Sequence, residues 1–129
     1  MKDVMNTFRN LAHKSGKVLD STYDCRKAEP YYVEILKLIK MHPEHRAQFV
    51  KEFLSILNLG NAPWELIQFC MRELQWGEIK NEITIEKQEE LSGNHDWRIN
   101  SVLDHILEVY EKKWEDAELY QYYSKEGKE

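Results

Sequence analysis

Residues 63–79, with the sequence PWELIQFCMRELQWGEI, decide the fold, because they read as a helix that is apolar around most of its circumference. At about 100° per residue, the polar side chains, Glu73 aside, cover only about a quarter of the circumference; they are Glu65, Gln68, Arg72 and Gln75. A helix on a protein surface ordinarily has an apolar stripe only somewhat wider than about 100°. We therefore expect a central helix that packs between neighbours on two sides.

The chain of 129 residues fits one domain, 1–129, since one hydrophobic core commonly organises roughly 100 to 150 residues. Hydrophobic residues are 42% of the sequence, charged residues 32% and aromatic residues 12%, which is typical of a folded globular protein. The five glycines and three prolines are few, and sparse chain breakers favour long helices with short connections over a many-stranded fold. The composition therefore predicts an all-α protein.

Apolar residues recur at helical spacing along most of the chain, which predicts five or six helices. Pro30 and Pro43 suit helix starts, and Gly60 suits a helix end. In EITIE, residues 82–86, apolar and polar residues also alternate as in a strand, but a single strand has no partner, so we favour a helix there. The expected helices span about 3–22, 30–41, 43–58, 62–76, 78–90 and 97–120.

Short connections between these segments predict consecutive antiparallel helical hairpins. Helices 30–41 and 43–58 would form one pair, and helices 62–76 and 78–90 the next. Helical hairpins stacked in series are typical of α-solenoids, and a compact bundle fits the same pattern equally well. No internal sequence repeat is established that would decide between the two arrangements.

The chain carries 18 basic and 23 acidic side chains, which gives a net charge of −5 at pH 7. Acidic residues outnumber basic residues by six to two within 78–96 and by seven to four within 108–129. Nucleic-acid-binding proteins usually carry a clustered basic stripe, which is missing here, so we expect no nucleic-acid binding. An acidic surface fits a basic protein partner, and it also fits an ordinary solvated helix surface.

Nowhere do 18 apolar residues follow one another, and the N-terminal residues contain no long apolar segment, so we expect no membrane contact. Cys25 and Cys70 stand 45 positions apart and form no CxxC motif. This spacing indicates neither a disulfide framework nor a cysteine zinc site. These features predict a cytoplasmic protein.

His42, Glu44 and His45 are the sharpest candidate for chemistry, because histidine and carboxylate side chains bind divalent metals. Pro43 lies between the histidines, which places His42 outside the helix that carries His45. The two imidazoles then need not converge. We therefore expect no metal site, with solvated histidines at helix ends as the ordinary interpretation.

Motifs of nucleophilic catalysis and of phosphate binding are missing from the sequence. Several carboxylates recur on the last expected helix, largely opposite its apolar stripe, where a solvated surface is the simpler interpretation; they are Glu108, Glu111, Glu115 and Glu118. We expect no enzymatic activity and no cofactor.

The aromatic residues exceed what one small helical core requires, and Trp and Tyr are favoured anchors of protein interfaces. Phe69 and Trp76 border the polar strip of the central helix, and Trp97 faces away from the apolar stripe of its own helix. The C-terminal segment is either frayed or held in place by its tyrosines. The candidate partner-binding residues are Phe69, Trp76, Trp97, Tyr120, Tyr122 and Tyr123.

These features predict a non-enzymatic protein–protein interaction module that presents an aromatic surface with an acidic rim, either to another protein or to a second copy of itself. An immunity-type neutraliser of a basic toxin or nuclease is one alternative. A metal- or ligand-binding enzyme that uses His42 and His45 is another. Such an enzyme would bring both histidines together with carboxylates of another helix in a cleft, whereas an interaction module would expose contiguous aromatic side chains.

Overall fold

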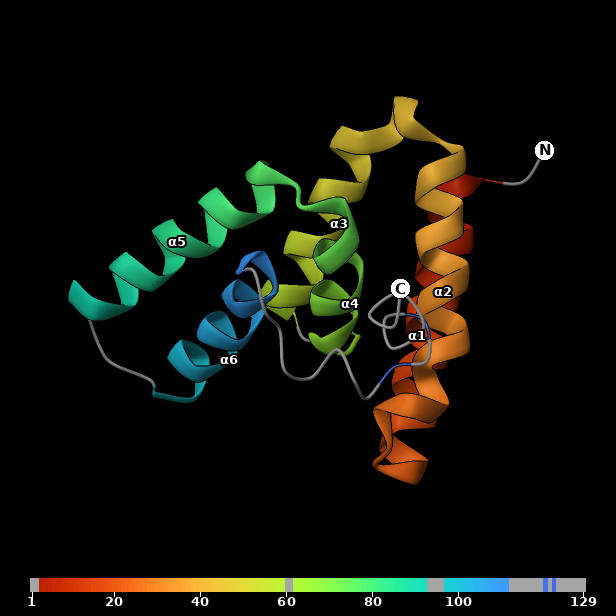
Figure 1. The fold of residues 1–129 in the computed structure, drawn as a ribbon, viewed down its shortest axis with the longest axis horizontal. Helices are drawn as coiled ribbons and strands as arrows, with labels where there is room; N and C mark the ends of the chain where they lie inside the picture. Colours follow the sequence, from red (N-terminus) through yellow and green to blue (C-terminus); the bar gives the residue numbers. More distant parts are fainter. Residues whose placement is uncertain (1–2, 60–61, 93–96, 112–119, 121, 123–129) are drawn as a thin grey trace.

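The computed structural model describes residues 3–59, 62–92, 97–111, 120 and 122 (Figure 1). Within these ranges, side chains at 25, 58–59, 90–92 and 97–100 are not described. The described residues form a compact bundle of six α-helices and two short 3-10 helices, with no strand among them, which confirms the all-α class. None of the described helices has the length and apolarity needed to cross a membrane.

The helices follow one another with short connections. The α-helices are α1 (Val4–Thr22), α2 (Cys25–Met41), α3 (Arg46–Leu59), α4 (Glu65–Leu74), α5 (Gly77–Ser92) and α6 (Trp97–Leu107). The 3-10 helices are η1 (Pro43–His45) and η2 (Glu108–Tyr110).

The helices α1 and α2 form an antiparallel hairpin, in which they share the most extensive helix–helix contact of the described fold (Figure 1). Tyr23 ends α1 in the left-handed conformation, with φ 54°. Asp24 then caps α2, since its carboxylate accepts a hydrogen bond of 3.0 Å from the N–H of Arg26. This cap starts α2 five residues before Pro30, so the expected start at Pro30 is wrong and the proline lies inside the helix.

The hairpins are α1 with α2 and α5 with α6, and not the pairs suggested by the sequence. After the η1 turn, α3 packs on α5. It also packs on α1, because Phe49 and Phe53 contact the ring of Phe8 with centroid separations of 5.7 and 5.4 Å. Apolar periodicity shows that a helix has a buried side, but it does not show which helix covers that side.

The short helix α4 lies at the centre of the molecule, between α2 on one side and α6 with η2 on the other (Figure 1). All six residues from Leu66 to Met71 are buried. The central helix expected from the wrap-around apolarity is therefore confirmed, although it is shorter than expected and ends at Leu74.

The ambiguous segment around residues 82–86 is helical and belongs to α5. Ile79 and Ile83 are buried, whereas Ile85 is 47% exposed. The Thr84 hydroxyl donates to the carbonyl of Lys80 at 2.8 Å, a contact between residues four apart that fits helical geometry. Ile83 therefore faces the core, and Ile85, two residues later, lies on the outer side of the helix.

The last helix is shorter than expected, because α6 ends at Leu107 and η2 ends at Tyr110. Glu111 is extended, with φ −79° and ψ 163°. The side chain of Arg72 donates to the carbonyls of Val109 and Glu111, at 3.0 and 2.6 Å. These contacts satisfy carbonyls that a continued helix would have bonded internally.

Candidate functional site

The aromatic side chains expected to form a binding surface are buried or partly buried wherever the structure describes them. Phe69 and Tyr120 are buried, with exposed fractions of 0% and 2%, and Trp76 is 7% exposed. Tyr122 is partly buried and packs against the core. The side chain of Trp97 and all of Tyr123 lie outside the described residues. The prediction of an exposed aromatic surface is therefore wrong for Phe69, Trp76 and Tyr120.

Phe69 lies at the centre of a cluster of aromatic rings. Its centroid is 5.5 Å from Tyr32, 5.0 Å from Tyr120 and 5.7 Å from Tyr122. The contact with Tyr120 is edge-to-face, with an interplanar angle of 79°, which is a favourable arrangement for aromatic pairs. Tyr120 and Tyr122 thus pack on the core over α2 and α4. The other residues of the C-terminal segment, on which the expectation of a frayed or anchored end also depends, lie outside the described residues.

The polar strip of α4 explains why sequence periodicity misplaced Phe69. Gln68 is buried, and its side-chain amide donates to the carbonyl of His105 at 2.7 Å. Arg72 and Gln75 donate to the carbonyl of Val109, at 3.0 and 2.9 Å. Three residues of the strip therefore bind backbone carbonyls of α6 and η2, and Phe69 on its border is buried at this contact.

Trp76 is buried because α4 ends before it. Gln75 adopts the left-handed conformation, with φ 53°, and so redirects the chain after Leu74. The Trp76 ring then packs edge-on against Phe53 at 6.2 Å, and the guanidinium of Arg46 lies 4.9 Å from its centroid. The helical wheel assumed a helix that continued to Trp76 and therefore gave the wrong direction for this side chain.

Tyr122 is held at two points by carboxylates from different helices. Its backbone N–H donates to Glu29 of α2 at 2.8 Å, and its hydroxyl donates to Glu73 of α4. Glu73 also forms an ion pair with Lys40 of α2. These contacts hold Tyr122 against α2 and α4 and serve the fold.

His42, Glu44 and His45 converge, contrary to the expectation from Pro43. Glu44 Oε2 lies 3.3 Å from His42 Nδ1 and 3.8 Å from His45 Nε2. The side chains of the two histidines are 30% and 36% exposed, and that of Glu44 is 61% exposed. A backbone hydrogen bond and the neighbouring His42 lower the pKa of the Glu44 carboxyl. The cluster is an accessible group of possible metal ligands.

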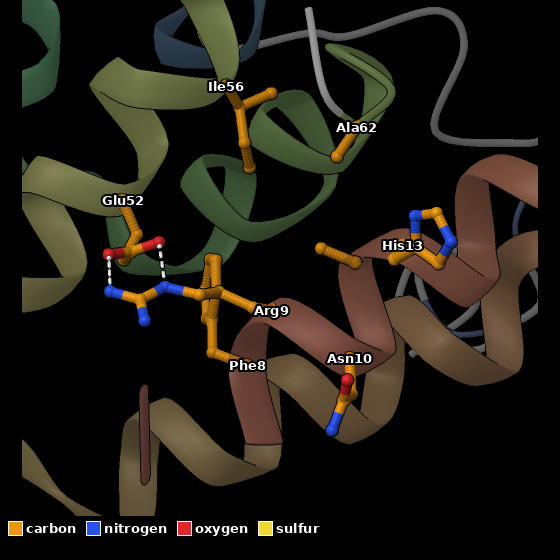
Figure 2. Close-up of a pocket in the computed structure, with 8 residues that line it drawn as sticks. Phe8, Arg9, Asn10, His13, Glu52, Ile56 and Ala62 are labelled. Atoms are coloured by element: carbon orange, nitrogen blue, oxygen red, sulfur yellow. Dashed lines mark hydrogen bonds and ion pairs between the residues drawn. The ribbon is translucent and has the colours of Figure 1, made fainter. Parts of the chain in front are cut away.

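A cavity of about 300 Å³ lies between α1 and α3, where Figure 2 shows the side chains that face it. Its lining residues are Phe8, Arg9, Asn10, Ala12, His13, Glu52, Ile56 and Ala62. Arg9 and Glu52 pair across its edge through two hydrogen bonds of 3.0 and 2.7 Å. Because these opposite charges neutralise each other, the cavity indicates no particular ligand class.

The two cysteines give no evidence of nucleophilic chemistry. Cys70 is buried in α4, and its burial raises the pKa of the thiol, which keeps it protonated and unreactive. The side chain of Cys25 is outside the described set.

Glu108, one of the carboxylates expected on the last helix, lies 3.4 Å from His105, one helical turn earlier. This is an ordinary surface contact.

A row of carboxylates follows one side of α5, and we call it the acidic ridge; it consists of Glu78, Glu82, Glu86 and Glu89. At about 100° per residue these four positions lie within about 80° of one another. The two lysines of the helix lie on the other side and contact the body of the protein. Lys87 pairs with Asp104 of α6, and Lys80 lies 5.7 Å from the ring of Tyr110.

Three large apolar side chains are exposed in the described part of the chain: Tyr23, Met41 and Ile85. Of these, Ile85 lies beside the acidic ridge on the same helix. The acidic residues were expected to form only a rim, and Ile85 was not among the expected binding residues. Its position two residues after Ile83, on the opposite side of a helix, was the available signal. Comparison of the chain with protein families, with curated proteins and with solved structures finds no match.

Proposed function

We propose that this protein is a non-catalytic interaction module that binds a basic surface of another protein through the acidic ridge and Ile85. The observation that carries the proposal is a half-exposed isoleucine beside a row of carboxylates. Within the described part of the chain, Glu82 and Glu86 form no ion pair. Both carboxylates are therefore available to a cationic partner.

The two features have separate roles in binding. Ile85 supplies apolar area that becomes buried on association. The carboxylates of Glu82 and Glu86 attract a basic partner, raise the rate of encounter and disfavour acidic proteins. Neutralisation of a basic toxin or nuclease is one form of this function, since an acidic helix would cover the cationic site that such a protein offers to its substrate.

Site-specific photo-cross-linking tests the proposal. A photoreactive phenylalanine analogue replaces Ile85, or replaces Lys37 on the exposed side of α2 as the matched control. Cross-linking is carried out in the source cells, and mass spectrometry identifies the attached peptide. The proposal expects a peptide rich in Lys and Arg at position 85 and none at position 37.

Charge reversal then tests the role of the ridge with the purified partner. The double change Glu82→Lys and Glu86→Lys should weaken binding at least about tenfold, because attraction becomes repulsion, while Glu34→Lys on α2 should leave the affinity nearly unchanged. Equal affinity in both variants would contradict the proposal. A cross-link from Ile85 to a second copy of this chain would also contradict it.

A further inference from the structure

The junction between α2 and α3 brings three metal-ligating side chains to one point. One ring nitrogen each of His42 and His45 and one carboxylate oxygen of Glu44 all lie within 4.8 Å of one another. The two imidazole rings have centroids 5.9 Å apart and are tilted by 41°. Among the residues that the structure describes, this is the one group of three His, Cys or acidic side chains with such convergence.

The backbone itself builds this convergence. The N–H of His42 donates to the carbonyl of Ile39 at 3.1 Å and so ends α2. The N–H of His45 donates to the carbonyl of His42 at 3.0 Å, which closes the η1 turn. Pro43 fixes its own φ at the first position of that turn. All three side chains therefore come from one rigid turn, and no distant element has to move to assemble them.

The separations fit a single small cation. Zinc lies about 2.0 to 2.2 Å from imidazole nitrogen and carboxylate oxygen, so two such donors at the tetrahedral angle are about 3.4 Å apart. The observed separations from Glu44 Oε2 are 3.3 Å to His42 and 3.8 Å to His45. Side-chain rotations of these partly or fully exposed residues would bring all three donors, now within 4.8 Å of one another, to that spacing.

We propose that His42, Glu44 and His45 bind one late first-row divalent metal ion, of which Zn²⁺ is the representative, and that water completes its coordination. Two imidazoles and one carboxylate are ligands typical of zinc sites with an open position. Nitrogen donors favour zinc, cobalt, nickel and copper over magnesium and calcium, which prefer oxygen. The exposure of the three side chains leaves room for the ion and for its water. This inference does not rest on the protein partner proposed above.

The neighbouring charges leave the carboxylate of Glu44 available. Arg46 follows the cluster directly, but its guanidinium donates to Glu78 at 2.8 and 2.6 Å and lies over the Trp76 ring. Among the described side chains, the ion-pair partners of Glu44 are the two histidines. Its negative charge would therefore be neutralised by the cation instead of by a neighbouring side chain.

Calorimetric titration of the whole purified chain with ZnCl₂ tests the site. The wild-type chain should bind one equivalent of Zn²⁺ at the cluster. The substitutions His42→Asn, Glu44→Gln and His45→Asn should each weaken that binding at least about tenfold. Even the loss of a side chain that only supports a metal ligand lowers metal affinity about 10- to 100-fold. His13→Asn removes an exposed histidine from α1, and Cys25→Ser removes the second thiol of the sequence; both should leave the affinity unchanged. Circular dichroism confirms that each variant remains folded.

The proposal is overturned by a wild-type chain that binds no zinc. It is also overturned if the three cluster variants bind zinc as tightly as the wild-type chain, or if His13→Asn or Cys25→Ser weakens binding as strongly as they do. A parallel titration with MgCl₂ should show no binding at the cluster. Binding of Mg²⁺ as tight as that of Zn²⁺ would contradict the assignment to a late transition metal.

Discussion

Gln68 shows how a single polar residue can organise a core. Its amide donates to the His105 carbonyl at 2.7 Å while the side chain is buried between α4 and α6. Gln68→Met keeps a similar volume but removes the donor, and it should lower the free energy of unfolding by about 1 to 3 kcal/mol, the cost of a lost buried hydrogen bond. Urea denaturation measures the change. Gln48→Met, at an exposed position of α3, is the control, and equal effects of the two changes would contradict the role given to Gln68.

Glu65 provides a test that depends on pH. Partial burial raises the pKa of its carboxyl above the ordinary value of 4.5. The folded chain therefore binds this proton more tightly than the unfolded chain, so the free energy of unfolding falls as the pH rises from about 4.5 through the raised pKa. Glu65→Gln should increase stability at about pH 7 and change it less at about pH 3, where the carboxyl is protonated in both states.

Denaturation of the Glu65→Gln and wild-type chains at both pH values measures this difference. Glu82→Gln, at an exposed position of α5, controls for the loss of one negative charge. The account of Glu65 fails if Glu65→Gln destabilises the chain at about pH 7, or if both variants behave alike.

At the scale of elements, Pro30 is the least favourable residue of α2. Proline inside a helix costs about 3 kcal/mol relative to alanine, and part of this cost is offset because proline restricts the unfolded chain. Pro30→Ala should therefore raise the free energy of unfolding by about 2 kcal/mol. Pro43→Ala, at the first position of η1, should instead lower it by about 0.4 to 1 kcal/mol. Chemical denaturation measures both changes, and destabilisation by Pro30→Ala would contradict the position of this proline in the helix.

Most elements were predictable from the spacing of apolar residues. Met5, Phe8 and Ala12 identify the buried side of α1, and Ile79 with Ile83 identifies that of α5. The central position of α4 was predictable because apolar residues surround most of it. Helix ends were less predictable, since Asp24 and Gln75 set them through a cap and a left-handed turn.

The candidate sites were less predictable than the elements, for two physical reasons. A helical wheel assigns polar residues to water, but Arg72 and Gln75 bind backbone carbonyls of η2. A proline between two histidines was taken to separate them, but the 3-10 turn at Pro43 brings the side chains of His42 and His45 to the same carboxylate. Both errors concern contacts that residue spacing does not encode.

At the scale of the whole molecule, Tyr120 and Tyr122 join the core from the far end of the sequence. Deletion of residues 120–129 removes Tyr120 and Tyr122 and uncovers the rings of Tyr32 and Phe69. We expect the free energy of unfolding to fall by at least about 3 kcal/mol, as for the loss of a large buried side chain, with increased binding of a hydrophobic dye. Deletion of residues 123–129 retains both tyrosines and is the control. Equal losses from the two deletions would contradict this role.

The fold rests on burial of the aromatic residues in the core, and Ile85 with the acidic ridge is the surface that we propose for recognition. Hydroxyl-radical footprinting of the free chain, read residue by residue by mass spectrometry, tests this burial most directly. Tyr23 and Tyr120 have the same chemistry but exposed fractions of 89% and 2%, so the ratio of their oxidation rates reports accessibility. The account predicts rapid oxidation of Tyr23 and Met41 and strong protection of Phe69, Trp76 and Tyr120. Oxidation of Tyr120 and Trp76 as fast as that of Tyr23 would show that both aromatic side chains are exposed and would contradict their place in the core.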